Sequence, residues 1–273
     1  MFLHESPDTT QYYCFNNLSQ YGDTIVHGVF TRHGGISDLN FKSLNVGLTA
    51  GDDKDSVWFN RKIVAKTMGA KEGRTIYLNQ VHGKNFLVLR GDNSNGCKVE
   101  KQSEDNQPYQ SRQDADGIIT NIKGILTVMQ VADCQAVILY DPVNQVIANI
   151  HSGWRGSLLN IIGRGVDIMV EKFDSSPASI LAAVSPSLGP CCAEFKNYRE
   201  EIPEYLWRYR VKSTDNEYHF DFWQMSFDQL TDKGILPQNI EVAGVCTTCS
   251  SHIFYSYRKE NITGRFAVAS GLV

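Results

Sequence analysis

The stretch that decides the fold is ILTVMQVADCQAVILYDPVNQVIANIHSGWRGSLLNIIGRGVDIMV, residues 125–170. Three apolar, β-branched runs follow one another at 125–131, 136–140 and 145–150, and polar or turn-forming residues separate them. These runs predict three neighbouring strands. Only after them does the apolar period become helical, with a stripe from Leu158 to Phe173. Because the strands do not alternate with helices, this stretch favours an α+β fold over a doubly wound one.

The rest of the chain extends this pattern on both sides. Asp53 can cap a helix that ends at Gly69, and Trp223, Phe227 and Leu230 mark another that ends near Gly234. Further strands are expected at 24–30, 75–78, 85–89, 180–185, 240–245 and 253–257.

We therefore predict an α+β fold, with mixed β-sheets in the core and helices packed outside. Residues 1–273 are expected to form a single domain, because a chain of this length can bury one large core and no polar stretch within it is predicted to be a domain linker. The longest such stretch, 91–113, is charged and short of core-forming residues, so we expect a polar surface excursion there.

Composition excludes several classes of partner. A formal net charge of -4 gives no basic field for nucleic acid. The first residues lack the pattern of a signal peptide, and no run approaches the roughly 18 apolar residues that cross a bilayer. We therefore expect a cytoplasmic protein with no nucleic acid or membrane partner. Seven cysteines, an odd number in a chain of this size, indicate reduced thiols.

Three residues suggest a metal site, although each has an ordinary structural explanation. His82 lies between two predicted strands, where a surface histidine is common. Cys134 lies between two apolar strands, where a buried thiol is equally reasonable. His151 lies where a predicted strand joins a helix. Two imidazoles and a thiolate are ligands that zinc prefers, and three protein ligands leave the open position of a catalytic site. The same set also binds copper.

The junction HSGWRG, residues 151–156, also suggests an anion site. Its glycines allow close approach of the backbone, the helix start offers N–H groups, and Arg155 adds guanidinium donors. The alternative is a tight turn with Arg155 paired to a surface carboxylate. Two further cysteine groups, Cys191-Cys192 and Cys246-x-x-Cys249, can bind a metal or do redox chemistry, but we expect buried, reduced thiols because a structural zinc site needs two suitably spaced pairs.

Eight motifs in order from about residue 27 to 268 resemble the laccase-domain family, also called multicopper polyphenol oxidoreductases. They are TRHGGIS, LNVGLTAGDD with Val57-x-x-Asn60-Arg61, LNQVHG, DADGIIT, VADCQAVILYD, NIHSGWRG, SPSLGPCCAEF and YSYRKENITGR. The resemblance implies that His82, Cys134 and His151 are catalytic zinc ligands. Gln135-Ala136 and Ser152 depart from residues usual in the family, and neither departure touches a proposed ligand.

The resemblance also implies an activity: a purine nucleoside phosphorylase acting on adenosine, inosine and methylthioadenosine, with an adenosine deaminase side activity. Purine nucleosides and phosphate would then be its small-molecule partners. Residues near the motifs are candidates for the substrate pocket, with turn stabilisation as the equally reasonable alternative. These candidates are Arg155, Arg32, Arg258, Asn45, Gln80 and Asp133.

Two other enzyme classes stay open at this point. A laccase-like polyphenol oxidase normally calls for several coppers and paired histidines, whereas this chain has seven histidines and no His-x-His. It stays open as weak phenol oxidation by a single copper ion at the same three residues. A metal-free cysteine hydrolase or amidase that edits peptidoglycan precursors would use Cys134 as nucleophile and His82 or His151 as base. A binding module without enzymatic activity would need an exposed apolar or charged surface, and the sequence shows no sign of one.

Overall fold

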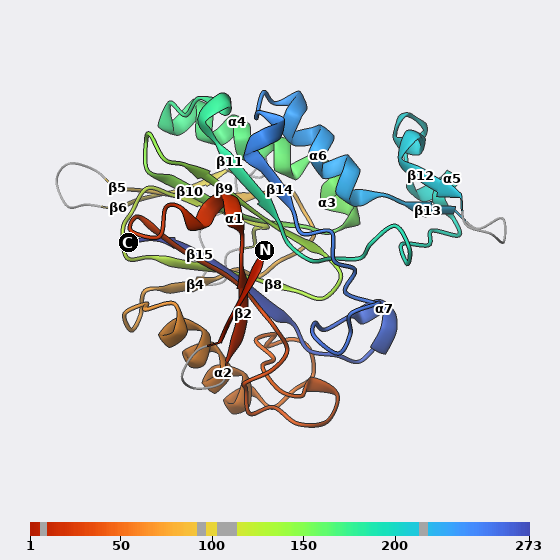
Figure 1. The fold of residues 1–273 in the computed structure, drawn as a ribbon, viewed down its shortest axis with the longest axis horizontal. Coiled ribbons are helices and arrows are strands. Elements are labelled where there is room, and N and C mark those ends of the chain that lie inside the picture. Colours follow the sequence, from red (N-terminus) through yellow and green to blue (C-terminus); the bar gives the residue numbers. More distant parts are fainter. Residues whose placement is uncertain (6–9, 92–96, 103–113, 213–217) are drawn as a thin grey trace.

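The computed structural model describes residues 1–5, 10–91, 97–102, 114–212 and 218–273. Two β-sheets pack face to face, and helices cover the outer face of each sheet (Figure 1). The predicted α+β class, with mixed sheets in the core and helices outside, is confirmed. The extent of the single domain stays a prediction.

The larger sheet contains the strands predicted from residues 136–150. Its pairs are antiparallel except for β11 with β14 and β5 with β7, which are parallel. In spatial order it comprises β14 (Ile240–Val242), β11 (Leu181–Val184), β9 (Gln135–Asp141), β10 (Val146–Ser152), β7 (Gly117–Thr120), β5 (Phe86–Gly91) and β6 (Cys97–Gln102).

The smaller main sheet is antiparallel except where β4 pairs with β8. In spatial order it comprises β1 (Phe2–Glu5), β2 (Gln11–Cys14), β3 (Ile25–Phe30), β15 (Phe266–Leu272), β8 (Leu126–Val131) and β4 (Thr75–Tyr77). A separate hairpin pairs β12 (Arg210–Lys212) with β13 (Tyr218–Phe220).

Three helices of at least ten residues cover the sheets: α2 (Lys54–Thr67), α4 (Ile161–Phe173) and α6 (Phe222–Asp232). As predicted, Asp53 caps α2, accepting a hydrogen bond from the backbone N–H of Ser56. The shorter helices are α1 (Asn16–Ser19), α3 (Trp154–Leu158), α5 (Tyr198–Glu201) and α7 (Tyr257–Glu260), with 3-10 turns at Leu39–Phe41, Pro177–Ser179, Glu204–Tyr209 and Pro237–Asn239.

Three of the four clusters of buried apolar residues follow these layers, and the fourth lies beside the β12–β13 hairpin. One lies between the sheets, where Ile138 of β9 and Met129 of β8 belong to the same buried cluster. A second lies between the larger sheet and α4 with α6, and a third between the smaller sheet and α2. Every residue of β9 and β10 is buried, which explains why their sequences are almost continuously apolar rather than alternating.

Several details differ from the sequence predictions. Residues 253–257 form no strand: Phe254 and Tyr255 fill the core from a turn, and Ser256 caps α7. The helix predicted around Leu158 to Phe173 is interrupted at Asn160, which adopts a left-handed conformation with φ 51°. The Asn160 side chain caps the N-terminus of α4 by accepting a hydrogen bond from the backbone N–H of Gly163. Strands β1, β2, β6, β7, β12, β13 and β15 were not predicted.

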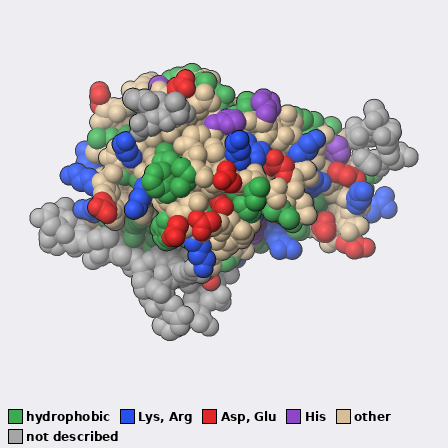
Figure 2. Space-filling model, turned by 90° about the horizontal axis from the view of Figure 1, so that it is seen from below, with side chains coloured by type: hydrophobic (Ala, Val, Ile, Leu, Met, Phe, Trp, Pro, Cys, Tyr) green, Lys and Arg blue, Asp and Glu red, His purple; other side chains and the backbone are tan. Residues whose placement is uncertain are grey.

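The predicted excursion at 91–113 is described only in part. Strand β6 lies within it and pairs with β5 at the edge of the larger sheet, while 92–96 and 103–113 fall outside the described residues. None of the helices in the described part of the chain combines the length and apolar character that a membrane crossing requires. In Figure 2, basic and acidic side chains are interspersed over the described part of the face seen from below.

Candidate metal centre

The fold brings His82, Cys134 and His151 together. His82 lies in the loop between β4 and β5, Cys134 in the turn where the chain passes from β8 of one sheet to β9 of the other, and His151 near the end of β10. One potential ligand atom of each residue lies within 4.8 Å of the other two. The three widely spaced candidates therefore form one cluster.

The backbone around the cluster adopts conformations that most residues avoid. His82 has φ 59° and the neighbour of Cys134, Asp133, has φ 81°. Non-glycine residues are uncommon in this region, and such conformations concentrate at functional sites. At Gly153 there is no room for a side chain, because an added Cβ would lie 2.8 Å from Cδ2 of His82 and 3.1 Å from Sγ of Cys134.

The distances in the cluster fit a tetrahedral metal ion. Sγ of Cys134 lies 3.7 Å from Nε2 of His82, and the two imidazole rings meet edge to face with centroids 4.8 Å apart. Bond lengths of about 2.3 Å to sulfur and 2.0–2.1 Å to nitrogen place two tetrahedral ligands about 3.6 Å apart. The donor set and its spacing therefore fit zinc, with copper also compatible with two imidazoles and a thiolate.

A buried carboxylate, Asp116, orients both histidines. Its Oδ1 lies 2.8 Å from Nδ1 of His151 and accepts a hydrogen bond from the backbone N–H of His82 at 2.9 Å. Its Oδ2 accepts from the backbone N–H of Gly83 at 2.8 Å and from that of Val81 at 3.3 Å. Because Nδ1 of His151 is engaged by the carboxylate, Nε2 is the nitrogen left to bind a metal, as in carboxylate–histidine–metal arrangements.

The charges in the cluster favour a thiolate. Burial alone would raise the pKa of Cys134, but the charge of His151 and hydrogen bonds from both histidines lower it to about 6. Burial alone would lower the pKa of His151, but Cys134 and Asp116 together raise it to about 9. Without a metal, the residues therefore form a thiolate–imidazolium pair, and a bound cation would replace the proton of His151.

A cavity of about 1160 Å³ adjoins the cluster and is lined by all three residues. Four arginines line it as well, whereas Asp133 is its one acidic lining residue among those that the structure describes. Its walls also carry aromatic rings, which suit a flat, partly apolar ligand such as a nucleobase. The arginines are Arg61, Arg155, Arg258 and Arg265, and the aromatic residues are Trp58, Tyr77, Trp154, Phe195, Phe222 and Tyr257.

Two of the predicted pocket arginines line this cavity. Arg155 is exposed, its guanidinium lies 5.0 Å from the ring centroid of Trp154, and its side chain makes no hydrogen bond to any described residue. Arg258 also lines the cavity, and its Nη1 donates to the carbonyl of Glu194. Arg155 therefore has its donors available for a ligand.

The other predicted pocket residues hold the structure together. Gln80 and Asp133 line the cavity, yet the Gln80 amide pairs with both backbone groups of Gln130, and the Asp133 carboxylate accepts three hydrogen bonds. Arg32 and Asn45 lie outside the lining: Arg32 pairs with Glu260 at 2.6 Å, and the Asn45 side chain bridges loop backbone and a nearby carboxylate.

Three residues of the site were not singled out from the sequence, although each lies in a quoted motif. Asp116 belongs to DADGIIT, Arg61 follows Asn60 in the second motif and Arg265 ends YSYRKENITGR. A carboxylate directly before a strand was a signal that could have identified Asp116. Arg61 offered no such signal, since its role depends on Tyr77, whose ring centroid lies 3.9 Å from its guanidinium.

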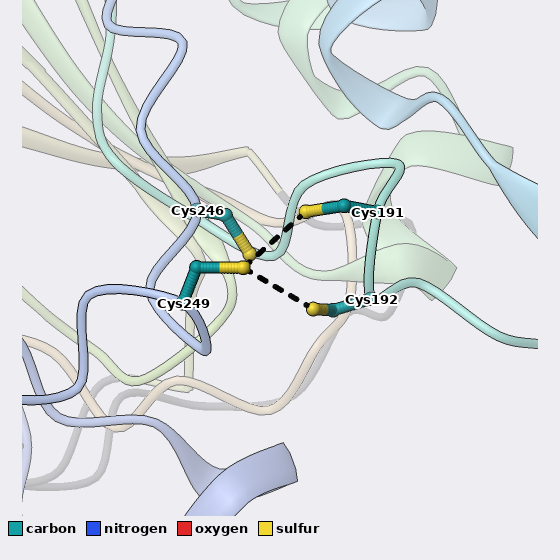
Figure 3. Close-up of side chains that lie close together, drawn as sticks. All are labelled: Cys191, Cys192, Cys246 and Cys249. Atoms are coloured by element: carbon teal, nitrogen blue, oxygen red, sulfur yellow. Dashed lines mark hydrogen bonds between the residues drawn. The ribbon is translucent and has the colours of Figure 1, made fainter.

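The remaining cysteine groups also come together. Cys191 and Cys192 face Cys246 and Cys249, with all four sulfur atoms within 4.8 Å of one another (Figure 3). All four are free, but the prediction that they are buried holds only for Cys246: Cys192 is half-buried, and Cys191 and Cys249 are exposed. The four cysteines lie on two loops, with Cys246 buried beneath the exposed pair.

The sequence model of the family described as multi-copper polyphenol oxidoreductase laccase matches residues 26–272. The chain is similar to a Geobacillus stearothermophilus protein named purine nucleoside phosphorylase YlmD, with 29% identity over 90% of this chain and 89% of that protein. It is 30% identical to the Escherichia coli K12 purine nucleoside phosphorylase YfiH over 87% of this chain and 89% of that one. The crystal structure of the Geobacillus YlmD superposes with a TM-score of 0.81 at 26% identity, covering 99% and 98% of the two chains.

Proposed function

The chain belongs to the multi-copper polyphenol oxidoreductase laccase family, and we propose that it is a zinc-dependent purine nucleoside phosphorylase. The observation that carries the proposal is the His82, Cys134 and His151 cluster beside a cavity lined by arginines and aromatic rings. Its relatives named purine nucleoside phosphorylases support the same activity. The proposed substrates are phosphate with adenosine, inosine or methylthioadenosine.

In the proposed reaction, a phosphate oxygen forms a bond to C1′ of the ribose while the bond from C1′ to the base breaks. The base leaves with the electron pair and takes up a proton. Arg155 would hold the phosphate, since its exposed guanidinium offers paired donors that match phosphate oxygens. Aromatic residues of the cavity would stack on the base; Trp154, which contacts Arg155, and Phe195, which contacts Trp154, are the first candidates.

His82, Cys134 and His151 would hold the zinc ion, and Asp116 would keep His151 in the ligating tautomer. When bound, zinc would supply a Lewis acid that polarises the substrate. Zinc is preferred over a multi-copper centre because the two ligand clusters among the described residues contain only two histidines between them. We extend the proposal to a side activity, the hydrolytic deamination of adenosine in the same cavity.

A cytoplasmic location is part of the proposal. It is supported by the six described cysteines outside β6, all of which are free thiols, as expected in a reducing compartment.

The experiment is a phosphate titration with adenosine, inosine and methylthioadenosine, in which free base and ribose 1-phosphate are quantified together. Arg155→Ala should raise the KM for phosphate about tenfold or more, the loss expected for a charge-assisted hydrogen bond. Arg164→Ala is the matched control, because Arg164 lies half-buried on α4, pairs with Glu171 and is not among the cavity-lining residues that the structure describes. An unchanged phosphate KM in Arg155→Ala would reject this role, and absence of base release by the zinc-loaded protein would reject the phosphorylase.

A second function is favoured by one observation: Cys134, His151 and Asp116 also have the order of a nucleophile, a base and an orienting carboxylate. A metal-free cysteine hydrolase acting on an amide would form an acyl-enzyme on Cys134. Mass spectrometry of the metal-free protein after incubation with amide and ester substrates tests it. An acyl adduct on Cys134 would support the hydrolase, and an unmodified chain would exclude it.

A further inference from the structure

The cysteines at 191, 192, 246 and 249 form a second cluster that the proposed reaction does not use. Cys191 and Cys192 lie on the loop that follows β11, and Cys246 and Cys249 on the loop that follows β14. Free cysteine is among the most buried residue types in proteins, yet Cys191 and Cys249 are exposed. A cluster of four free thiols, two of them exposed, calls for a chemical explanation.

The spacing of the sulfur atoms matches a tetrahedral metal site. Sγ of Cys249 lies 3.6 Å from Sγ of Cys191 and 3.6 Å from Sγ of Cys192 (Figure 3). In a tetrahedral zinc site, Zn–S bonds of about 2.3 Å place neighbouring sulfur atoms about 3.8 Å apart. A disulfide would need about 2.05 Å, and one sulfur cannot form it with both neighbours.

The backbone already holds the two loops in this arrangement. Ser187 and Cys246 form a parallel β-bridge, and the backbone N–H of Thr247 donates to the carbonyl of Ser187. The backbone N–H of Gly189 donates to Sγ of Cys246 at 3.3 Å, the kind of contact that supports a ligating sulfur. An added Cβ at Gly189 would lie 3.0 Å from Cβ of Cys246. The loops therefore approach closely enough to share one ion.

The first loop also forms part of the cavity wall, and both loops are bonded to Asp133 in that wall. Ser187 and Leu188 of the first loop line the cavity, and the backbone N–H of Leu188 donates to the carbonyl of Asp133, next to Cys134. In the second loop, Thr247 donates from Oγ1 to the carboxylate of the same Asp133 at 2.6 Å. An ion that joined these loops would fix the residue beside the candidate centre from two sides.

We propose that Cys191, Cys192, Cys246 and Cys249 form a second, structural zinc site that joins the two loops and holds the cavity wall. Four thiolates in a tetrahedron are a closed ligand set, typical of structural zinc and without an open position for substrate. The site is separate from the His82, Cys134 and His151 cluster, since the two share no residue. This proposal is independent of the phosphorylase activity.

The test is the zinc content of the purified full-length protein, measured by native mass spectrometry together with elemental analysis. The wild type should hold two zinc ions per chain. Cys249→Ser and Cys134→Ser should each hold one, and the double variant none. Cys14→Ser is the matched control, because Cys14 is a buried free cysteine outside both clusters and its replacement should leave two ions.

Two further measurements keep the proposal testable if Cys249→Ser fails to fold. Cobalt loaded into Cys134→Ser should give intense sulfur-to-cobalt charge-transfer bands of a four-thiolate site. Added zinc should also raise the Tm of metal-depleted Cys134→Ser, since a ligand that binds only the folded state stabilises it. A wild-type content of one zinc that Cys249→Ser retains would overturn the proposal, as would disulfides among these four cysteines in the purified protein.

Discussion

Replacing Asp116 by Asn tests whether the buried carboxylate organises the metal centre. The carboxylate receives hydrogen bonds on both oxygens: Oδ1 faces His151 and the backbone of His82, and Oδ2 faces the backbone N–H of Gly83. An asparagine side chain has only one oxygen, so its NH2 group must occupy the place of the other carboxylate oxygen. If its amide nitrogen takes the place of Oδ2, it faces the N–H donor of Gly83; if it takes the place of Oδ1, it donates to Nδ1 of His151 and favours the tautomer that cannot ligate through Nε2.

Either orientation has a cost that can be measured. Loss of a carboxylate partner of a ligating histidine lowers metal affinity about 10–100-fold, or about 1.4–2.7 kcal/mol. A buried donor without a partner costs about 1–3 kcal/mol, so the metal-free variant should also unfold at a lower temperature. The affinity is measured by competition with a chromophoric chelator in Asp116→Asn and in the control Asp114→Asn. Asp114 lies two residues away, is exposed and pairs with Asn79 instead.

Equal zinc affinity of Asp116→Asn and the wild type, with Asp114→Asn also unchanged, would refute the reasoning. If the cysteine cluster also binds zinc, the comparison is made in a Cys249→Ser background so that only one site is titrated.

Three other predictions follow from the same geometry. Gly153→Ala should weaken zinc binding at the centre, because the added Cβ would approach the sulfur of Cys134 to 3.1 Å. The control Gly22→Ala, whose Cβ would lie 3.6 Å from its nearest atom, should leave zinc affinity unchanged. Equal zinc affinities of the two variants in chelator titrations would contradict this prediction. Zinc affinity at the centre should fall about tenfold per pH unit from pH 9 towards pH 6, because the raised pKa of about 9 keeps His151 protonated in this range and zinc must displace that proton. Below pH 6 the affinity should fall more steeply, because Cys134, with a pKa of about 6, also gains a proton. A zinc affinity that does not change with pH would argue against this prediction. Asn160→Ala should lower the free energy of unfolding by about 2 kcal/mol, since alanine disfavours φ 51° and removes the cap of α4, and urea unfolding with an unchanged midpoint would exclude this role.

The sequence predicts the strands best where burial is complete. Strands β9 and β10 are buried along their whole length, so their apolar runs identified them directly. Strand β15 was missed although it lies in the middle of its sheet, because FAVASGL is rich in small residues. The reason is tertiary: an added Cβ at Gly271 would lie 2.4 Å from the carbonyl oxygen of Ile125, so close strand packing rather than local propensity selects glycine there.

The prediction of the candidate site was limited in the same way. Residue chemistry singled out His82, Cys134 and His151, but their convergence depends on tertiary structure: the chain crosses from one sheet to the other between β4 and β5 and between β8 and β9, and β10 pairs with β9. The cysteine cluster was not predicted because its two halves are far apart in the chain. They meet through the parallel pairing of β11 with β14, which no local pattern reveals.

The most direct test of the proposed function is the phosphate-dependent release of adenine from adenosine, measured before chelation, after chelation and after zinc is restored. A zinc-dependent phosphorylase should lose base release when the metal is removed, recover it when zinc is returned, and show neither activity nor recovery in Cys134→Ala. Base release that persists in the fully metal-free wild type, or that the Cys134→Ala protein retains, would contradict the account.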